Sequence, residues 1–200
     1  MLALKILAFV VLIYLLWVFA RGELHFFKFC LGSVSLFFFL MIFLQPVLLR
    51  PLSMAVTAAA GVLGDVFGMY DSYYQYFILF IPKHTTSISL VIDYECSGIV
   101  EIFAFSSLLW FFPLYNIMEK LIVSGIGIAV IFLANVLRLF VICTLIYIFG
   151  NEIFYFAHTI FGRIIFYLFS VVLYFYVFTR PHIIRQKVGN FTYGNSDIVD

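Results

Sequence analysis

LIVSGIGIAVIFLANVLRLFVICTLIYIF, residues 121–149, is apolar throughout and carries one formal charge, Arg138. A helix of about 20 apolar residues is enough to cross the hydrocarbon core of a bilayer, which is about 30 Å thick. A helix also satisfies its backbone hydrogen bonds internally, as a lipid-facing segment must. This stretch is therefore predicted to be a transmembrane helix.

The rest of the chain has the same character. Its composition is 66% hydrophobic and 10% charged, with a mean hydropathy of +1.17, whereas a soluble domain is roughly 45–50% apolar. We predict an all-α membrane protein, a polytopic bundle of about six transmembrane helices that forms a single domain over residues 1–200. The expected spans are 3–20, 29–49, 53–69, 97–112, 121–149 and 159–178. The first lacks a small-residue cleavage site, so we interpret it as a retained span and not as a signal peptide.

The third span and the segment after it have special compositions. SMAVTAAAGVLGDVFGM, residues 53–69, is rich in Ala and Gly and contains Asp65, so it is expected to pack closely against its neighbours more than to face lipid, or to form a re-entrant segment. Further along, TSISLVI alternates in the manner of a strand, and YFILFI is expected to pair with it. We predict a short hairpin at the membrane surface before the fourth span.

The distribution of Lys and Arg predicts the orientation, because cationic loops are retained in the cytoplasm. The tail RPHIIRQK is the clearest basic cluster, so we place both termini, including the polar tail 179–200, in the cytoplasm. Alternation through six spans then puts the loops that hold Cys96 and His158 on the outer face of the cell membrane. A net charge of +1 gives no basis for nucleic-acid binding.

The cysteines predict neither a disulfide framework nor a metal site. Cys30, Cys96 and Cys143 are odd in number and lack metal-ligand spacing. We therefore expect at least one free thiol and no metal or other cofactor.

Cys96 stands in DYECSGIVEI, residues 93–102, where an extended segment meets the fourth span. A helix start favours the thiolate, which is the nucleophilic form of cysteine, and is expected to expose the thiol. The neighbouring Asp93 and Glu95 oppose the thiolate, so a reactive Cys96 needs a cation from elsewhere. The alternative is that Cys96 is a small apolar residue at a helix start.

Asn135 and Arg138 lie three residues apart in the fifth span and hence on nearly the same helix face. A buried arginine costs at least about 2.5 kcal/mol on insertion scales, so Arg138 is expected to face a polar interior site. A guanidinium stays charged, so a catalytic role for it would be electrostatic. The alternative is a structural ion pair with Glu101 or Asp65.

His158 stands at the outer end of the sixth span, in NEIFYFAHTIFGR. Histidine titrates near neutral pH and suits proton transfer, although a lone interfacial histidine is often a surface residue. His25, His84 and His182 lie in charged connections or turns and are weaker candidates.

ECSG stands at a span start, NVLR lies inside the next span, and a histidine stands at the start of the span after that. The order of these three motifs resembles the pattern of the exosortase/archaeosortase family of membrane cysteine transpeptidases. The resemblance covers roughly residues 55–178, and the short chain is most similar to compact single-domain versions from Gram-positive bacteria. It implies that Cys96 is the nucleophile, Arg138 stabilises thiolate or oxyanion, and His158 transfers protons. Supporting residues on the same segments are Ser97, Gly98, Glu101 and Asn135.

The resemblance also implies the partners. The substrates would be secreted precursor proteins with a C-terminal sorting signal, made of a short motif, a transmembrane helix and a basic tail. Cys96 would form a thioester with the substrate, in contact with membrane lipid, and an amine acceptor or water would release the product.

Two rival functions remain open. A membrane cysteine endopeptidase that trims a signalling-peptide precursor would need a histidine close before the cysteine, and His84 lies twelve residues before Cys96. A transporter or assembly factor would use Asp65, Glu101, Arg138 and Arg163 as a buried ion network. A transporter should tolerate Cys96→Ala, and either enzyme should not.

Overall fold

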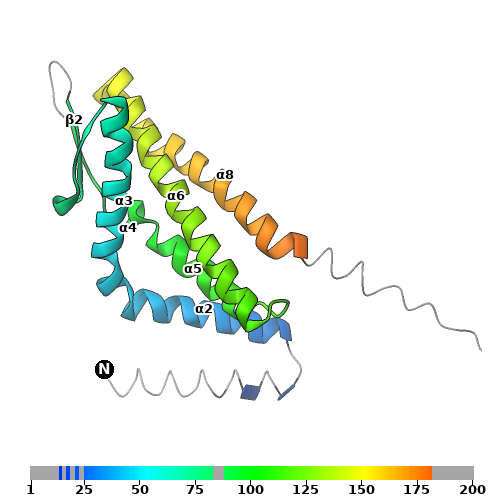
Figure 1. The fold of residues 1–200 in the computed structure, drawn as a ribbon. Helices are drawn as coiled ribbons and strands as arrows, with labels where there is room; N and C mark the ends of the chain where they lie inside the picture. Colours follow the sequence, from blue (N-terminus) through cyan, green and yellow to red (C-terminus); the bar gives the residue numbers. More distant parts are fainter. Residues whose placement is uncertain (1–13, 15–16, 19–20, 23–24, 83–87, 182–200) are drawn as a thin grey trace, which may run out of the picture.

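The computed structural model of the chain describes residues 14, 17–18, 21–22, 25–82 and 88–181. Its main helices are α2 (His25–Phe43), α3 (Gln45–Phe67), α5 (Ile99–Phe111), α6 (Ile117–Phe149) and α8 (Gly162–Tyr174). Figure 1 shows that α3, α5, α6 and α8 form a bundle and that α2 crosses its lower end. A small sheet lies beside α3 at the upper end.

Four helical stretches in the described part of the chain are long and apolar enough to cross a membrane: Phe26–Phe43, Gln45–Phe67, Ile117–Phe149 and Phe154–Thr179. The predicted span 97–112 is helical as α5, but its 13 residues make a helix of about 20 Å, too short to cross the core alone. Most of the predicted first span, 3–20, lies outside the described residues. The predicted class, a helical membrane bundle with a small hairpin, is confirmed.

The boundary between the second and third spans differs from the prediction. The sequence predicts a break between residues 49 and 53, around Pro51, but α2 ends at Phe43, α3 begins at Gln45, and Pro51 lies inside α3. Pro46 occupies the first turn of α3, where a proline leaves no intrahelical hydrogen bond unmade. The earlier proline therefore starts the helix, which at 23 residues is long enough to span.

The predicted hairpin is confirmed and is part of a three-stranded antiparallel sheet. β1 (Asp71–Tyr73), β2 (Ile78–Ile81) and β3 (Ile88–Val91) follow one another in space as in sequence. Leu79 pairs with Leu90 across β2 and β3, and both side chains are buried. The sheet thus presents an apolar face, while β1 adds a strand that the alternating pattern did not predict.

The Ala/Gly-rich part of α3 packs closely against the loop and strand that follow it, as predicted. A Cβ on Gly61 would overlap Ser72, whose Oγ donates to the carbonyl oxygen of Thr57 at 3.0 Å. Tyr70 donates its hydroxyl hydrogen to the carbonyl of Ala60 at 2.7 Å. Burial, with smaller effects of nearby Cys143 and Asp65, raises the pKa of the Tyr70 hydroxyl, which therefore remains a donor.

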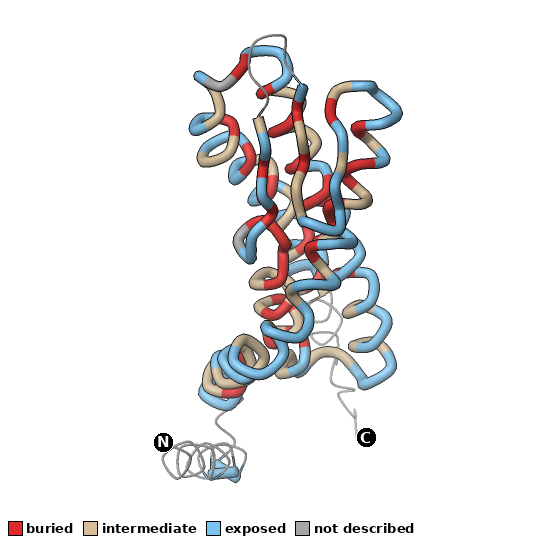
Figure 2. The backbone as a smooth tube through the Cα atoms, turned by 90° about the vertical axis from the view of Figure 1, so that its left-hand side faces the viewer, coloured by how far each residue is buried: buried red, intermediate tan, exposed pale blue. Residues whose placement is uncertain are grey.

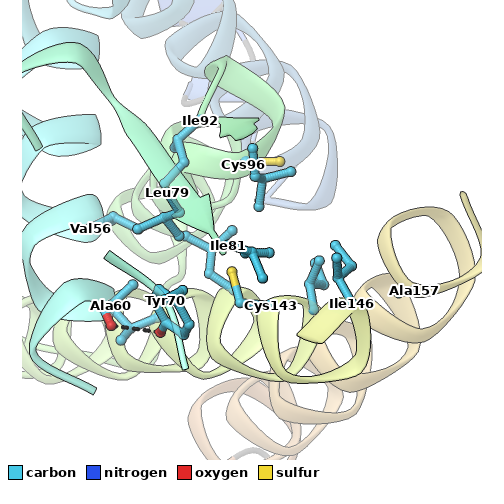
Figure 3. Close-up of a cluster of buried hydrophobic side chains, with 14 residues drawn as sticks. Val56, Ala60, Tyr70, Leu79, Ile81, Ile92, Cys96, Cys143, Ile146 and Ala157 are labelled. Atoms are coloured by element: carbon cyan, nitrogen blue, oxygen red, sulfur yellow. Dashed lines mark hydrogen bonds between the residues drawn. The ribbon is translucent and has the colours of Figure 1, made fainter. Parts of the chain in front are cut away.

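The upper core joins α3, the sheet and α6. Figure 3 shows Val56 and Ala60 of α3 facing Leu79 and Ile81 of β2, with Cys143 and Ile146 of α6 alongside. Cys96 and Ala157 belong to the same cluster. Burial is concentrated in the middle and upper bundle, whereas the crossing helix α2 is mostly exposed or half-buried (Figure 2).

A second buried cluster joins α5, α6 and the C-terminal helix below the first. Gly127 of α6 allows the close approach, because a Cβ there would overlap the ring of Phe105, which is fully buried. The first cluster includes Cys96 of α4 (Tyr94–Ser97), and this turn packs against both α3 and α6.

Candidate active site

Cys96 lies in α4, a single helical turn before α5. The Asp93 carboxylate caps the turn by accepting from the backbone N–H of Tyr94 at 2.6 Å. Gly98 ends it with φ +77°, a left-handed conformation that favours glycine. A single turn carries little macrodipole. The helix start therefore stabilises a Cys96 thiolate less than the sequence suggests.

Ser97 has a local role in the same turn. Its hydroxyl donates to the carbonyl of Tyr94 at 2.9 Å and accepts from the backbone N–H of Ile99 at 3.3 Å. The side chain therefore ties α4 to the first residue of α5 across the break at Gly98. These bonds support the backbone around Cys96 and do not point to a chemical step.

The structure brings Cys96 and His158 into contact. The Sγ atom of Cys96 lies 3.2 Å from Nε2 of His158, although the residues are 62 positions apart. The expectation that the thiol is exposed is wrong, because only 3% of the Cys96 surface is accessible. The residue belongs to the buried upper core, together with residues of α3, the sheet and α6. A buried thiol in contact with an imidazole can lose its proton directly to that ring.

His158 lies in a π-helical segment, Ala157–Phe161, at the start of the last span. Single π-turns inside α-helices are rare and often occur at functional sites. The imidazole stacks on the Phe154 ring, with centroids 6.0 Å apart and an interplanar angle of 4°. Ala157, the preceding residue, is fully buried. The stack on Phe154 thus constrains the orientation of the imidazole ring.

Asn135 and Arg138 are both buried on α6, with 1% and 5% of their surfaces exposed. The Asn135 amide Nδ2 donates to the backbone carbonyl of Cys96 at 2.5 Å. Arg138, one turn further along the same helix face, lines a neighbouring cavity. The predicted shared face is confirmed, and its two residues reach different parts of the site.

The cavity has a volume of about 300 Å³ and both polar and apolar lining. Its lining residues are Tyr94, Val100, Glu101, Arg138, Arg163, Phe166 and Tyr167. The carboxylate oxygen Oε2 of Glu101 is buried there, without a hydrogen-bond partner in the described part of the chain. Of the two acidic partners considered for Arg138, Glu101 therefore shares its cavity, whereas Asp65 is exposed on α3.

The remaining sequence candidates lie elsewhere. Cys143 is buried in the upper core and Cys30 is half-buried on α2, and neither forms a disulfide with a described residue. No group of three potential metal ligands occurs among the residues that the structure describes. His84 and His182 lie outside those residues.

Several contributors to the site were not predicted from the sequence, among them three aromatic residues. Phe154 stacks on His158, and Tyr94 and Tyr167 line the cavity. Tyr94 is adjacent to the ECSG motif and Phe154 is one turn before His158, so helical spacing from the candidates was the available signal.

A comparison with protein-family models supplies the decisive observation: the model described as transmembrane exosortase (Exosortase_EpsH) matches residues 1–176. The chain belongs to the transmembrane exosortase family. The resemblance seen in the sequence is confirmed, and the match extends toward the N-terminus beyond the predicted core, 55–178. Comparisons with curated proteins and with solved structures gave no match.

This exosortase is accordingly a multi-pass membrane protein. Within its fold, Arg138 lines a cavity together with Tyr94, a residue of the turn that carries Cys96. Cys96 contacts His158, and Asn135 connects Cys96 to the helix of Arg138.

Proposed function

We propose that this exosortase is a membrane cysteine transpeptidase that cleaves C-terminal sorting signals from secreted precursor proteins. The observation that carries the proposal is the 3.2 Å contact between Cys96 Sγ and His158 Nε2. A thiol beside an imidazole forms the nucleophile and base pair that acyl transfer through cysteine requires. Membership of the exosortase family supports the choice of substrate.

In the first step, His158 takes the proton of the Cys96 thiol, and the thiolate attacks a peptide carbonyl carbon of the sorting signal. The resulting oxyanion is stabilised by the charge of Arg138, which remains protonated throughout. The intermediate then collapses and the C–N bond breaks. The imidazolium of His158 gives its proton to the departing amine, so the sorting tail leaves and a thioester remains on Cys96.

In the second step, an acceptor amine attacks the thioester carbonyl and loses a proton to His158. The C–S bond breaks, and the thiolate of Cys96 recovers that proton. Water gives a free carboxylate by the same route. Burial of Cys96 limits access of bulk water and so favours transfer to an amine.

The reaction is proposed to occur on the outer side of the cell membrane, with both termini in the cytoplasm. Asn135, whose amide bonds to the carbonyl of Cys96, lies about 22 Å along α6 from Lys120. With Lys120 near the inner boundary, the site falls in the outer part of the bilayer. A precursor helix that crosses the membrane would present its motif at that depth.

The test begins with the precursor, identified as a secreted protein that retains its C-terminal tail when this exosortase is deleted. Cys96→Ala should leave the tail uncleaved, whereas Cys30→Ala, a change at a half-buried thiol outside the site, should restore cleavage. Processing by the Cys96→Ala variant would contradict the proposal and favour a transporter or assembly factor. Release of a short soluble peptide, with no transfer to an acceptor, would favour an endopeptidase.

A further inference from the structure

Only one of the two polar atoms in the buried side-chain amide of Asn135 has a hydrogen-bond partner among the described residues. Its Nδ2 donates to the carbonyl of Cys96, while its Oδ1 is buried with no hydrogen-bond partner among the described residues. An amide buried with an unpaired acceptor is costly in apolar surroundings. Its single bond therefore adds little net stability, and the reason for an asparagine here lies in what the bond holds.

That bond reaches the backbone of Cys96 at a break between two helices, α4 and α5. In an uninterrupted α-helix the carbonyl of residue 96 would accept from the N–H of Val100. The left-handed Gly98 breaks the helix, and the helical bonding of α5 starts with Ile102 donating to the carbonyl of Gly98. The amide of Asn135 thus meets the carbonyl of Cys96 at the point where the helix is interrupted.

Gly98 also makes room for the amide. A Cβ on Gly98 would lie 3.3 Å from Nδ2 of Asn135, tighter than an ordinary contact. The glycine therefore serves the turn in two ways, through its positive φ and through its lack of a side chain beside the amide.

Cys96 is consequently held at both backbone groups and at its side chain. Its N–H donates to the carbonyl of Asp93 at 2.9 Å, its carbonyl accepts from Asn135, and its thiol contacts His158. The bond to Asn135 attaches the turn to α6, the helix that carries Arg138 one turn further on.

We propose that Asn135 is a positioning residue that fixes the Cys96 turn on α6 and so keeps the thiol within reach of His158. This inference rests on the proposed function for its effect on cleavage. A misplacement of about 1 Å in a reacting group can slow a reaction by about 100-fold. Without the amide, α4 loses its hydrogen bond to α6, and we expect the thiol to shift by that order, so that the rate falls while the substrate still binds.

The test uses the full-length protein purified in detergent, with Asn135→Leu and Asn135→Asp. Leucine removes both the donor and the unpaired acceptor, and aspartate keeps the size but in its ionised form offers no donor to the carbonyl. Both variants should lower kcat by about 10-fold to 100-fold and leave KM for the precursor within a factor of about two. The rates are normalised to monodisperse protein, so a lower yield of folded protein does not change them.

A second readout does not depend on cleavage. The rate at which methyl methanethiosulfonate modifies Cys96, followed by mass spectrometry of the Cys96 peptide, should change at least about threefold in both variants as the thiol moves away from His158. Thr144→Val is the matched control, because Thr144 is a half-buried residue of α6 that donates to the carbonyl of Phe140 at 2.8 Å. It should leave kcat and the modification rate unchanged.

Unchanged kcat and modification rate in the folded Asn135 variants would overturn the positioning role. Failure of both variants to fold, with Thr144→Val normal, would overturn it as well, since Asn135 would then be a determinant of folding. If the precursor proves not to be a substrate, the proposed function fails, and the modification rate still decides whether Asn135 positions the thiol.

Discussion

Replacement of His158 by alanine is predicted to slow cleavage by about 100-fold to 10,000-fold without unfolding the protein. A positioned acid or base contributes that range, which corresponds to about 2.7–5.4 kcal/mol of activation free energy. Nε2 of His158 lies 3.2 Å from Sγ of Cys96, so proton transfer needs no intervening water. Alanine removes this route.

The cost to stability is smaller and can be separated from the cost to catalysis. His158 is half-buried, and its stack on Phe154 is worth about 0.5–1.5 kcal/mol, as for other aromatic pairs. Phe154→Leu is the matched control, because it removes the stack and keeps the imidazole. It should lower the melting temperature about as much as His158→Ala and slow cleavage by less than about 10-fold.

The assay measures the first-order rate of precursor cleavage by detergent-purified protein, alongside the melting temperature of each variant. A normal rate for His158→Ala would refute proton transfer by His158. Equal rate losses in His158→Ala and Phe154→Leu would also refute it, since packing alone would then explain both.

Three further outcomes are expected. Arg138→Lys should fold yet cleave about 100-fold to 1,000-fold more slowly, because a point ammonium does not reproduce a forked guanidinium; full cleavage would leave Arg138 a structural role. Gly127→Ala should destabilise the protein by about 1–3 kcal/mol, because the added Cβ would overlap a buried ring of α5. Gly125→Ala is the control, since Gly125 has open space around it, and equal melting temperatures of the two variants would contradict this packing. In a cysteine-free background, a cysteine that replaces the exposed Tyr76 should react with an impermeant maleimide in intact cells. A cysteine that replaces the exposed Met118 should react only after the cytoplasmic face is opened. The reverse pattern would invert the proposed orientation.

Local patterns predicted the elements of the fold well. The length of the apolar segments identified the helices, and alternation identified the pairing of β2 with β3. The break at Pro51 was wrong because two prolines stand close together, and only tertiary structure shows that Pro46 starts α3. The short helix α5 was also predicted to be a transmembrane span, because the residues next to it in the sequence are as apolar as the helix itself.

The candidate site was predictable as a set of residues and not as an arrangement. The motifs pointed to Cys96, Arg138 and His158, whose roles stay predictions. The burial of Cys96 depends on α6 and Ala157, which no local pattern reveals. The bond from Asn135 to Cys96 joins residues 39 positions apart, and its geometry follows from a backbone break at Gly98 that sequence spacing does not fix.

The central claim, acyl transfer through Cys96, is tested most directly by the mass of the Cys96 peptide during turnover. Purified His158→Ala protein, incubated with precursor and quenched in acid, should carry the processed precursor on Cys96 in a fraction of molecules. Hydroxylamine should release that product, because it cleaves thioesters. The Cys96→Ala and double variants should carry no adduct and leave the precursor intact, the double variant being no worse than Cys96→Ala. Cleavage of the precursor by Cys96→Ala would contradict the account.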